Sequence, residues 1–150
     1  GASLRMALVR TFERLDADVR AVSVTSGTTL TVVAINATRR ELTVANVGDS
    51  AALLVEASRE TMLTEEHRLA SSASECERVR RGGGVLAAAL SSAGRPTGPL
   101  RAWPGGLAAC RTVGDADCPM ACAVPAVQTL TYDPFAGAAV VIASDGVWDA

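Results

Sequence analysis

Three apolar segments rich in β-branched residues follow one another with only short polar breaks between them. They cover residues 28–35, 41–47 and 51–55, so the breaks contain five and three residues. Parallel strands need a crossover of roughly a dozen residues or more, whereas antiparallel neighbours can be joined by a short turn. The spacing therefore predicts an antiparallel sheet, and three more strand-like segments extend it: residues 61–63, 126–131 and 138–143.

Two segments carry helical signals. Apolar residues recur at near-helical spacing between Leu4 and Val19, with charged residues on the other faces, which predicts an amphipathic helix packed on an apolar surface. Farther along the chain, Ser74 and Glu77 fit a capping box that opens a short helix. The glycines at residues 82–84 are expected to end that helix.

The stretch from residue 86 to residue 106 shows no sustained period. It is rich in Ala, Ser, Gly and Pro, so we expect a long irregular surface segment. Helices that are kept apart from runs of strands favour an α+β fold, in which helices are layered on a β-sandwich. The length of 150 residues fits a single domain.

Composition excludes several classes of protein. Hydrophobic residues make up 49% of the chain, which is enough for a packed core and excludes wholesale disorder. A net charge of −2 without a block of Lys or Arg argues against binding to nucleic acid. The longest apolar run, residues 136–143, is far shorter than the ~20 residues of a membrane span. We expect a monomer that is cytoplasmic or nuclear, with its four cysteines reduced.

Acidic residues stand where two apolar strands end. Asp49 follows the strand at 41–47, and Asp145 follows the strand at 138–143. Asp149 lies four residues after Asp145, so their carboxylates can face one cation if the residues between them form a helical turn. Carboxylate oxygens are the ligands that Mg²⁺ and Mn²⁺ prefer. The alternative is that these aspartates only cap turns or helix starts, as Asp commonly does.

Six short motifs occur in order along the chain and cover most of residues 4–150. The motifs are Ser26-Gly27-Thr28-Thr29, VANVGDS at residues 44–50, LTEEH at residues 63–67, Glu77-Arg78-Val79 with the glycines of 82–84, GLAACRTVGD at residues 106–115, and ASDGVWD at residues 143–149. In sequence and in order they resemble the motifs of the metal-dependent serine/threonine protein phosphatases of the 2C type. One departure is Glu66, which stands where the family usually has Asp.

The resemblance implies a central antiparallel β-sandwich flanked by helices on both sides, in α-β-β-α layers. It also implies two core Mg²⁺ or Mn²⁺ ions with a further, weaker one. The implied reaction is hydrolysis of phosphoserine and phosphothreonine in phosphoprotein substrates by a metal-activated water, without a covalent intermediate. Asp145 matches the aspartate that ligates the core ions, and Asp49 and Asp149 match aspartates that join it around the weaker site.

The resemblance also implies supporting roles for other positions. Asp115, Gly146 and Arg111 correspond to positions that support the site or the fold, and Arg111 is expected to be a buried ion-pair partner. His67 is expected to make a structural hydrogen bond rather than to take part in catalysis. Residues 85–105 correspond to the family's flap beside the active site.

Some family motifs do not occur in these 150 residues. The upstream D-G-H-[GA]-G motif, which supplies a metal-bridging Asp, and the downstream D-N motif are absent. We therefore expect residues 1–150 to be the central portion of one catalytic domain, truncated at both ends, inactive alone and prone to aggregate. The alternative is a family member that lacks these motifs and serves as a non-catalytic binding or regulatory module. The aspartates at 49, 145 and 149 favour the enzyme.

Overall fold

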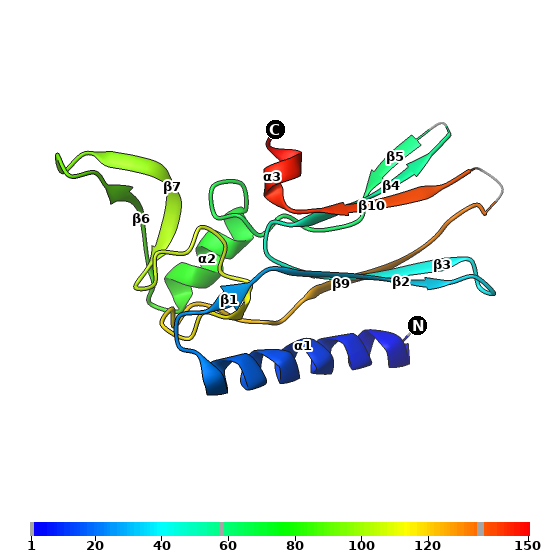
Figure 1. The fold of residues 1–150 in the computed structure, drawn as a ribbon, viewed down its shortest axis with the longest axis horizontal. Helices are drawn as coiled ribbons and strands as arrows, with labels where there is room; N and C mark the ends of the chain where they lie inside the picture. The colour runs from blue at the N-terminus through cyan, green and yellow to red at the C-terminus, as the bar shows by residue number, and fades with distance from the viewer. Residues whose placement is uncertain (1, 58, 135–136) are drawn as a thin grey trace.

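Two three-stranded antiparallel sheets face each other at the centre of the structure (Figure 1). The computed structural model describes residues 2–57, 59–134 and 137–150. One sheet has the strand order β2-β3-β9 and the other has the order β10-β4-β5. The bounds of these strands are β2 Leu30–Asn36, β3 Glu41–Val47, β4 Ala51–Glu56, β5 Arg59–Met62, β9 Ala126–Thr131 and β10 Ala139–Ala143.

Strand β3 is buried on both faces and forms the centre of the sandwich. Val44 packs with Leu54 of the second sheet, whereas Val47 packs on the other side with Phe12 of helix α1 (Ala2–Val22). Because successive side chains of a strand alternate between its faces, burial on both faces requires the almost continuous apolar run that β3 has. Strands β2 and β3 pair antiparallel, as predicted, and β4 pairs antiparallel with β5. The prediction that residues 41–47 and 51–55 are neighbours in one sheet is wrong, because the chain passes to the second sheet at the short break between β3 and β4.

Helix α1 lies along the outer face of the β2-β3-β9 sheet (Figure 1). It includes the whole segment predicted to be helical, residues 4–19, and extends beyond it at both ends. Phe12 is only 1% exposed, and Leu8, Val9 and Val19 belong to the same apolar cluster. Helices set apart from antiparallel sheets confirm the predicted α+β fold.

The N-cap of helix α2 (Ala73–Arg81) lies two residues before the predicted one, so the predicted capping box is wrong. Ser72, not Ser74, is the N-cap, and its Oγ accepts a hydrogen bond from the backbone N–H of Glu75 at 3.4 Å. Both serines have a glutamate three residues later, so the spacing alone does not choose between them. The burial of Glu75 decides in favour of the earlier pair. Gly82 caps the C-terminus of the helix, as expected.

The expectation of an irregular segment over residues 86–106 is wrong. Strands β6 (Val85–Leu90) and β7 (Pro96–Trp103) form an antiparallel hairpin that projects from the rest of the molecule (Figure 1). A turn closes the hairpin, with the N–H of Ser91 donating to the carbonyl of Arg95 at 2.8 Å. Alanine and glycine are poor strand formers. Cross-strand hydrogen bonds build this hairpin, and neither its composition nor its periodicity indicates them.

Shorter elements complete the fold. Strand β1 (Gly27–Thr28) pairs with β8 (Val113–Gly114), so the strand predicted from residue 28 onward is interrupted at Thr29. Helix α3 (Asp145–Trp148) follows β10. Within the described ranges, no helix is long and apolar enough to cross a membrane. All four cysteines are free thiols, as expected.

Candidate functional site

The turn after β3 presents Asp49 at one end of the sandwich. Gly48 has a φ of +100°, which residues with a side chain rarely adopt, and this conformation allows the sharp turn. Its N–H donates to Nδ1 of His67 at 3.2 Å. Nδ2 of Asn46 donates to the carbonyl of Glu65 at 3.1 Å. These two hydrogen bonds fix the turn, and with it Asp49, against the segment that carries His67.

The pairing of β10 with β4 brings Asp145 to the same end. The register ends with Ala143 opposite Ala51, so the residues after β10 lie beside the turn that precedes β4. Ser144 is the N-cap of α3 and Asp145 is its first residue. The N–H of Asp149 donates to the carbonyl of Asp145 at 2.8 Å, so the helical turn between the two aspartates is present.

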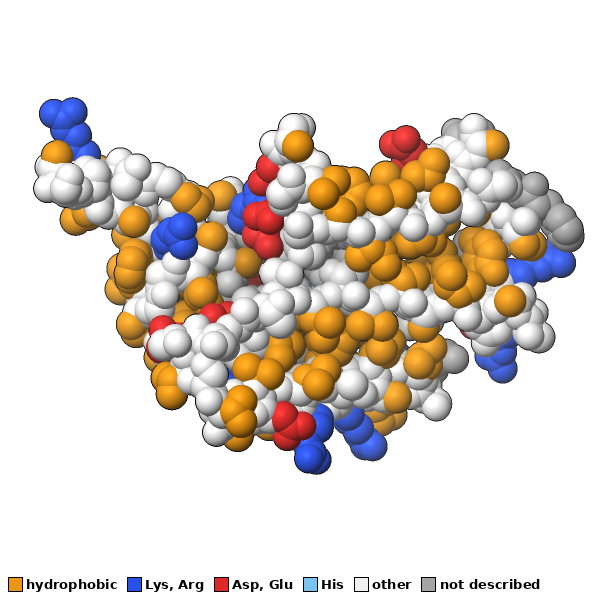
Figure 2. Space-filling model, viewed as in Figure 1, with side chains coloured by type: hydrophobic (Ala, Val, Ile, Leu, Met, Phe, Trp, Pro, Cys, Tyr) orange, Lys and Arg blue, Asp and Glu red, His pale blue; other side chains and the backbone are white. Residues whose placement is uncertain are grey.

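Asp49, Asp145 and Asp149 all lie next to one cationic side chain, that of Arg68. We call these four residues the Arg68 cluster. Nε of Arg68 lies 3.4 Å from Oδ2 of Asp49. Its Nη2 lies 3.6 Å from Oδ2 of Asp145, and its Nη1 lies 2.8 Å from Oδ2 of Asp149. Figure 2 shows acidic and basic side chains meeting close to α3. The structure therefore brings together the three aspartates that the sequence singled out.

The donor chemistry of the Arg68 cluster suits a divalent cation, but the cluster is closed around the guanidinium. Carboxylate oxygens are suitable ligands for Mg²⁺ and Mn²⁺. Within residues 2–57, 59–134 and 137–150, however, no three His, Cys, Asp or Glu side chains are close enough together to hold a metal ion. A divalent ion can therefore be held by these carboxylates only where Arg68 withdraws and they move closer together.

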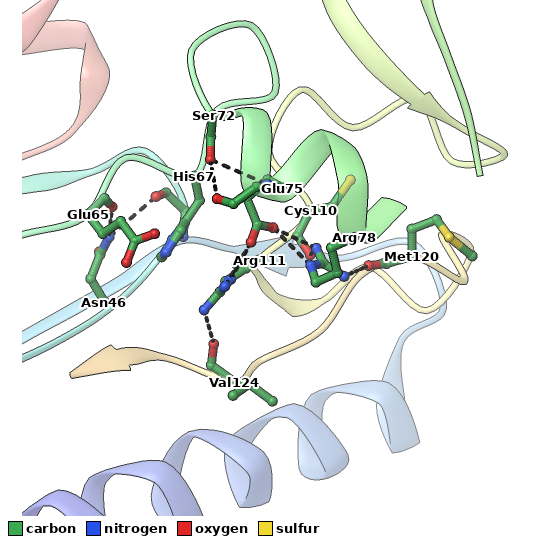
Figure 3. Close-up of polar contacts among 12 residues, drawn as sticks. Asn46, Glu65, His67, Ser72, Glu75, Arg78, Cys110, Arg111, Met120 and Val124 are labelled. Atoms are coloured by element: carbon green, nitrogen blue, oxygen red, sulfur yellow. Dashed lines mark hydrogen bonds and ion pairs between the residues drawn. The ribbon is translucent and has the colours of Figure 1, made fainter. Parts of the chain in front are cut away.

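A second polar cluster joins α2 to the segment after β7 (Figure 3). Glu75 is its centre and is 1% exposed. Oε2 of Glu75 lies 2.8 Å from Nη2 of Arg78, and its Oε1 lies 2.8 Å from Nη2 of Arg111. Burial by itself raises the pKa of Glu75, but hydrogen bonds and charges from the two arginines outweigh burial and lower that pKa from its ordinary value of 4.5. The carboxylate is therefore ionised at neutral pH.

Both arginines of this second cluster also bind main-chain carbonyls. Arg78 donates to the carbonyls of Cys110 and Met120, at 3.0 and 2.9 Å. Arg111 donates to the carbonyl of Val124 at 3.2 Å. The buried ion pairs therefore fasten residues 110–124 to α2.

Comparison with known proteins assigns the chain to a family. A family model described as protein phosphatase 2C matches residues 1–150. The chain belongs to the protein phosphatase 2C family. Its curated relatives include probable protein phosphatase 2C 5 of Arabidopsis thaliana, 39% identical over 149 residues, and probable protein phosphatase 2C 69 of Oryza sativa subsp. japonica, 41% identical over 150 residues. These matches cover 98% and 99% of this chain but 34% and 35% of the relatives, so the chain spans about a third of their length.

Solved structures share the fold of this protein phosphatase 2C chain. A sex-determining protein of C. elegans superposes with a TM-score of 0.81 at 27% identity, over 95% of this chain and 34% of that one. Serine-threonine phosphatase 2C from Toxoplasma gondii superposes with a TM-score of 0.76 at 21% identity, over 97% of this chain and 51% of that one. The second likeness concerns the fold alone. Both agree with helices packed on antiparallel sheets.

Asp115, which belongs to the GLAACRTVGD motif of this protein phosphatase 2C chain, borders the same hollow as Asp49. The hollow has a volume of about 290 Å³. Asp115 has a φ of +51°, and its N–H donates to the carbonyl of Ser26 at 2.9 Å. A Cβ on Gly27 would collide with the carboxylate of Asp115. A side chain at position 27 would therefore force the Asp115 carboxylate to move.

Gly146 and Arg111, the other two supporting positions of the family motifs, lie in different surroundings. Gly146 is the second residue of α3, and a Cβ there would have only Oγ of Ser144 within 4 Å, at 3.8 Å. Packing among the described residues thus does not require a glycine at this position. Arg111 pairs with Glu75, whereas the aspartates of the Arg68 cluster pair with Arg68.

His67 is completely buried beside the turn that carries Asp49. Its Nδ1 accepts the hydrogen bond from Gly48, so the proton of the neutral ring is on Nε2, which has no partner among the described residues. Burial, followed by the positive charge of Arg111, lowers the pKa of His67 from its ordinary value of 6.5. The imidazole is therefore neutral at pH 7, and the structural hydrogen bond predicted for it is confirmed.

This lowered pKa predicts acid sensitivity. Below pH 6.5 the unfolded chain takes up a proton at His67 more readily than the folded chain does. The free energy of unfolding should therefore decrease as the pH is lowered. The expected slope is at most about 1.4 kcal/mol per pH unit. Urea unfolding of the native-length protein between pH 7.5 and 5.5 measures this slope, and His67→Gln should flatten it. Equal slopes in the two proteins would contradict the prediction.

Sequence reasoning missed the residue at the centre of each polar cluster. Arg68 directly follows the LTEEH motif, and no spacing in the sequence links it to the aspartates. Glu75 lies three residues before Arg78 on α2, which is a spacing that places two side chains on one helix face. The capping box predicted at Ser74 and Glu77 selects the wrong glutamate. Glu77 pairs with Arg81 at the surface.

Proposed function

We propose that the protein is a Mg²⁺- or Mn²⁺-dependent phosphatase that hydrolyses phosphoserine and phosphothreonine in phosphoprotein substrates. The observation that carries the proposal is the convergence of Asp49, Asp145 and Asp149 at one end of the sandwich, in a chain of the protein phosphatase 2C family. Asp49 follows a strand and Asp145 and Asp149 stand at the two ends of α3, and carboxylate oxygens are the ligands that Mg²⁺ and Mn²⁺ prefer.

The proposed roles follow from where each side chain is held. Asp145, Asp49 and Asp149 provide the anionic oxygens for the ions. Bound Mg²⁺ or Mn²⁺ supplies an activated water and neutralises charge on the phosphoryl group. His67 and Asn46 hold the turn that carries Asp49, so that its backbone is fixed at this end of the sandwich.

The test is metal-dependent hydrolysis of a phosphothreonine peptide by the native-length protein. Hydrolysis should rise with Mn²⁺, stop with EDTA and return when Mn²⁺ is restored. A matched phosphotyrosine peptide should be hydrolysed much more slowly. A folded protein that binds Mn²⁺ without hydrolysing the peptide would contradict the proposal and favour a non-catalytic module.

A further inference from the structure

Arg68 is held by its backbone, while its side chain crosses to the aspartates. It forms an isolated antiparallel bridge with Ala109, and its carbonyl accepts hydrogen bonds from the N–H groups of Ser71 and Ser72, at 3.1 and 2.9 Å. Its own N–H donates to Oε1 of Glu66 at 3.1 Å. The guanidinium therefore reaches the aspartates from a fixed starting point.

The charges of the Arg68 cluster do not balance. Three carboxylates and one guanidinium leave two negative charges uncompensated. Asp49 is mostly buried, with 16% of its side chain exposed, whereas the side chains of Asp145 and Asp149 are 54% and 56% exposed. A cation from solution therefore has access to the cluster and is attracted to it.

The guanidinium and a divalent ion compete for the carboxylates of these aspartates. Arg68 contacts one carboxylate oxygen of each aspartate, and its planar fork holds the three groups around itself. A metal ion needs the oxygens to close in to roughly 2.0–2.6 Å from its own centre. The arginine side chain is long and flexible, and 24% of it is exposed, so it has a route into solvent.

We infer that Arg68 is a built-in competitor for the divalent ion. In the absence of the ion, its guanidinium neutralises part of the aspartate charge and holds α3 against the turn after β3. When the ion binds, Arg68 leaves. Its presence therefore weakens ion binding and makes the cluster respond over a higher range of Mg²⁺ or Mn²⁺ concentration. This inference rests on the proposed role of the three aspartates as cation ligands.

The test measures Mn²⁺ binding to the metal-free, native-length protein by isothermal titration calorimetry. Asp149→Asn identifies the class of sites that belongs to the cluster, because this variant should lose that class. Arg68→Gln should tighten the same class by about tenfold, because three partly exposed ion pairs no longer compete with Mn²⁺. Arg68→Lys keeps the charge and should bind Mn²⁺ much as the unaltered protein does.

Thermal unfolding provides a second measurement that does not depend on activity. Arg68→Gln should lower the melting temperature in EDTA, since the aspartates then repel one another, and Mn²⁺ should restore more stability to this variant than to the unaltered protein. Arg81→Gln is the matched control. It removes the same charge from an exposed pair on α2, with 77% of the Arg81 side chain exposed, and should change neither result.

Several outcomes would overturn the inference. The first is that Arg68→Gln binds Mn²⁺ no more tightly than the unaltered protein does. The second is that Arg81→Gln tightens Mn²⁺ binding as much as Arg68→Gln does. The third is that Asp149→Asn keeps every class of Mn²⁺ sites that the unaltered protein has. The proposed function is judged separately. Hydrolysis by the unaltered protein with unchanged binding in Arg68→Gln overturns only the inference, whereas tighter binding without any hydrolysis overturns only the proposed function.

Discussion

Replacing Asp145 by Asn should reduce Mn²⁺-dependent hydrolysis of a phosphothreonine peptide by more than about 100-fold, because losing even a partner of a metal ligand commonly costs about 10–100-fold. Asn keeps the shape of Asp but lacks its negative charge, so the anionic oxygen proposed for the ions is lost. The fold should persist, since 54% of the Asp145 side chain is exposed and its contact with Arg68 is long, at 3.6 Å.

The measurement is the rate of peptide hydrolysis by the native-length protein over a range of Mn²⁺ concentrations, with the melting temperature of each variant alongside. Asp18→Asn is the matched control. It neutralises an aspartate on α1 whose side chain is 59% exposed and pairs only with Arg14 among the contacts described, so hydrolysis should be unchanged. If the Asp145→Asn protein folds and keeps most of its activity, Asp145 is not a ligand of the metal ions.

The central strands could be predicted because their environment dictates their composition. Strand β3 is apolar on both faces because one face meets the second sheet and the other meets α1, and such a run has few other interpretations. The β6-β7 hairpin could not be predicted in this way. Apart from residues near its base such as Leu86, it packs mainly on itself, so its sequence shows neither alternation nor strong strand propensity.

The candidate site was predictable to the extent that its residues follow strands. Asp49 and Asp145 stand at the ends of apolar strands, and the family motifs select the same positions. That they meet depends on the pairing of β10 with β4, which an antiparallel sheet allows but which the sequence does not specify. Arg68 enters the cluster through tertiary placement alone, because the segment that carries it packs at the same end of the sandwich.

Glu75→Gln should destabilise the native-length protein by about 3–5 kcal/mol at pH 7, the usual cost of removing one partner from a buried ion pair. Gln has nearly the same shape but leaves Arg78 and Arg111 facing each other without the carboxylate between them. Urea unfolding measures the difference. Glu77→Gln on the same helix is the control, because its pair with Arg81 is exposed and should contribute less than about 1 kcal/mol.

The difference between the Glu75→Gln variant and the unaltered protein should also depend on pH. Because the pKa of Glu75 is lower in the folded than in the unfolded chain, its stabilising contribution is complete above its ordinary value of 4.5 and is lost as the pH falls through the folded-state pKa. The two proteins should therefore converge in stability only in acid. A difference that stayed constant into strong acid would mean that shape, rather than the carboxylate charge, joins α2 to residues 110–124.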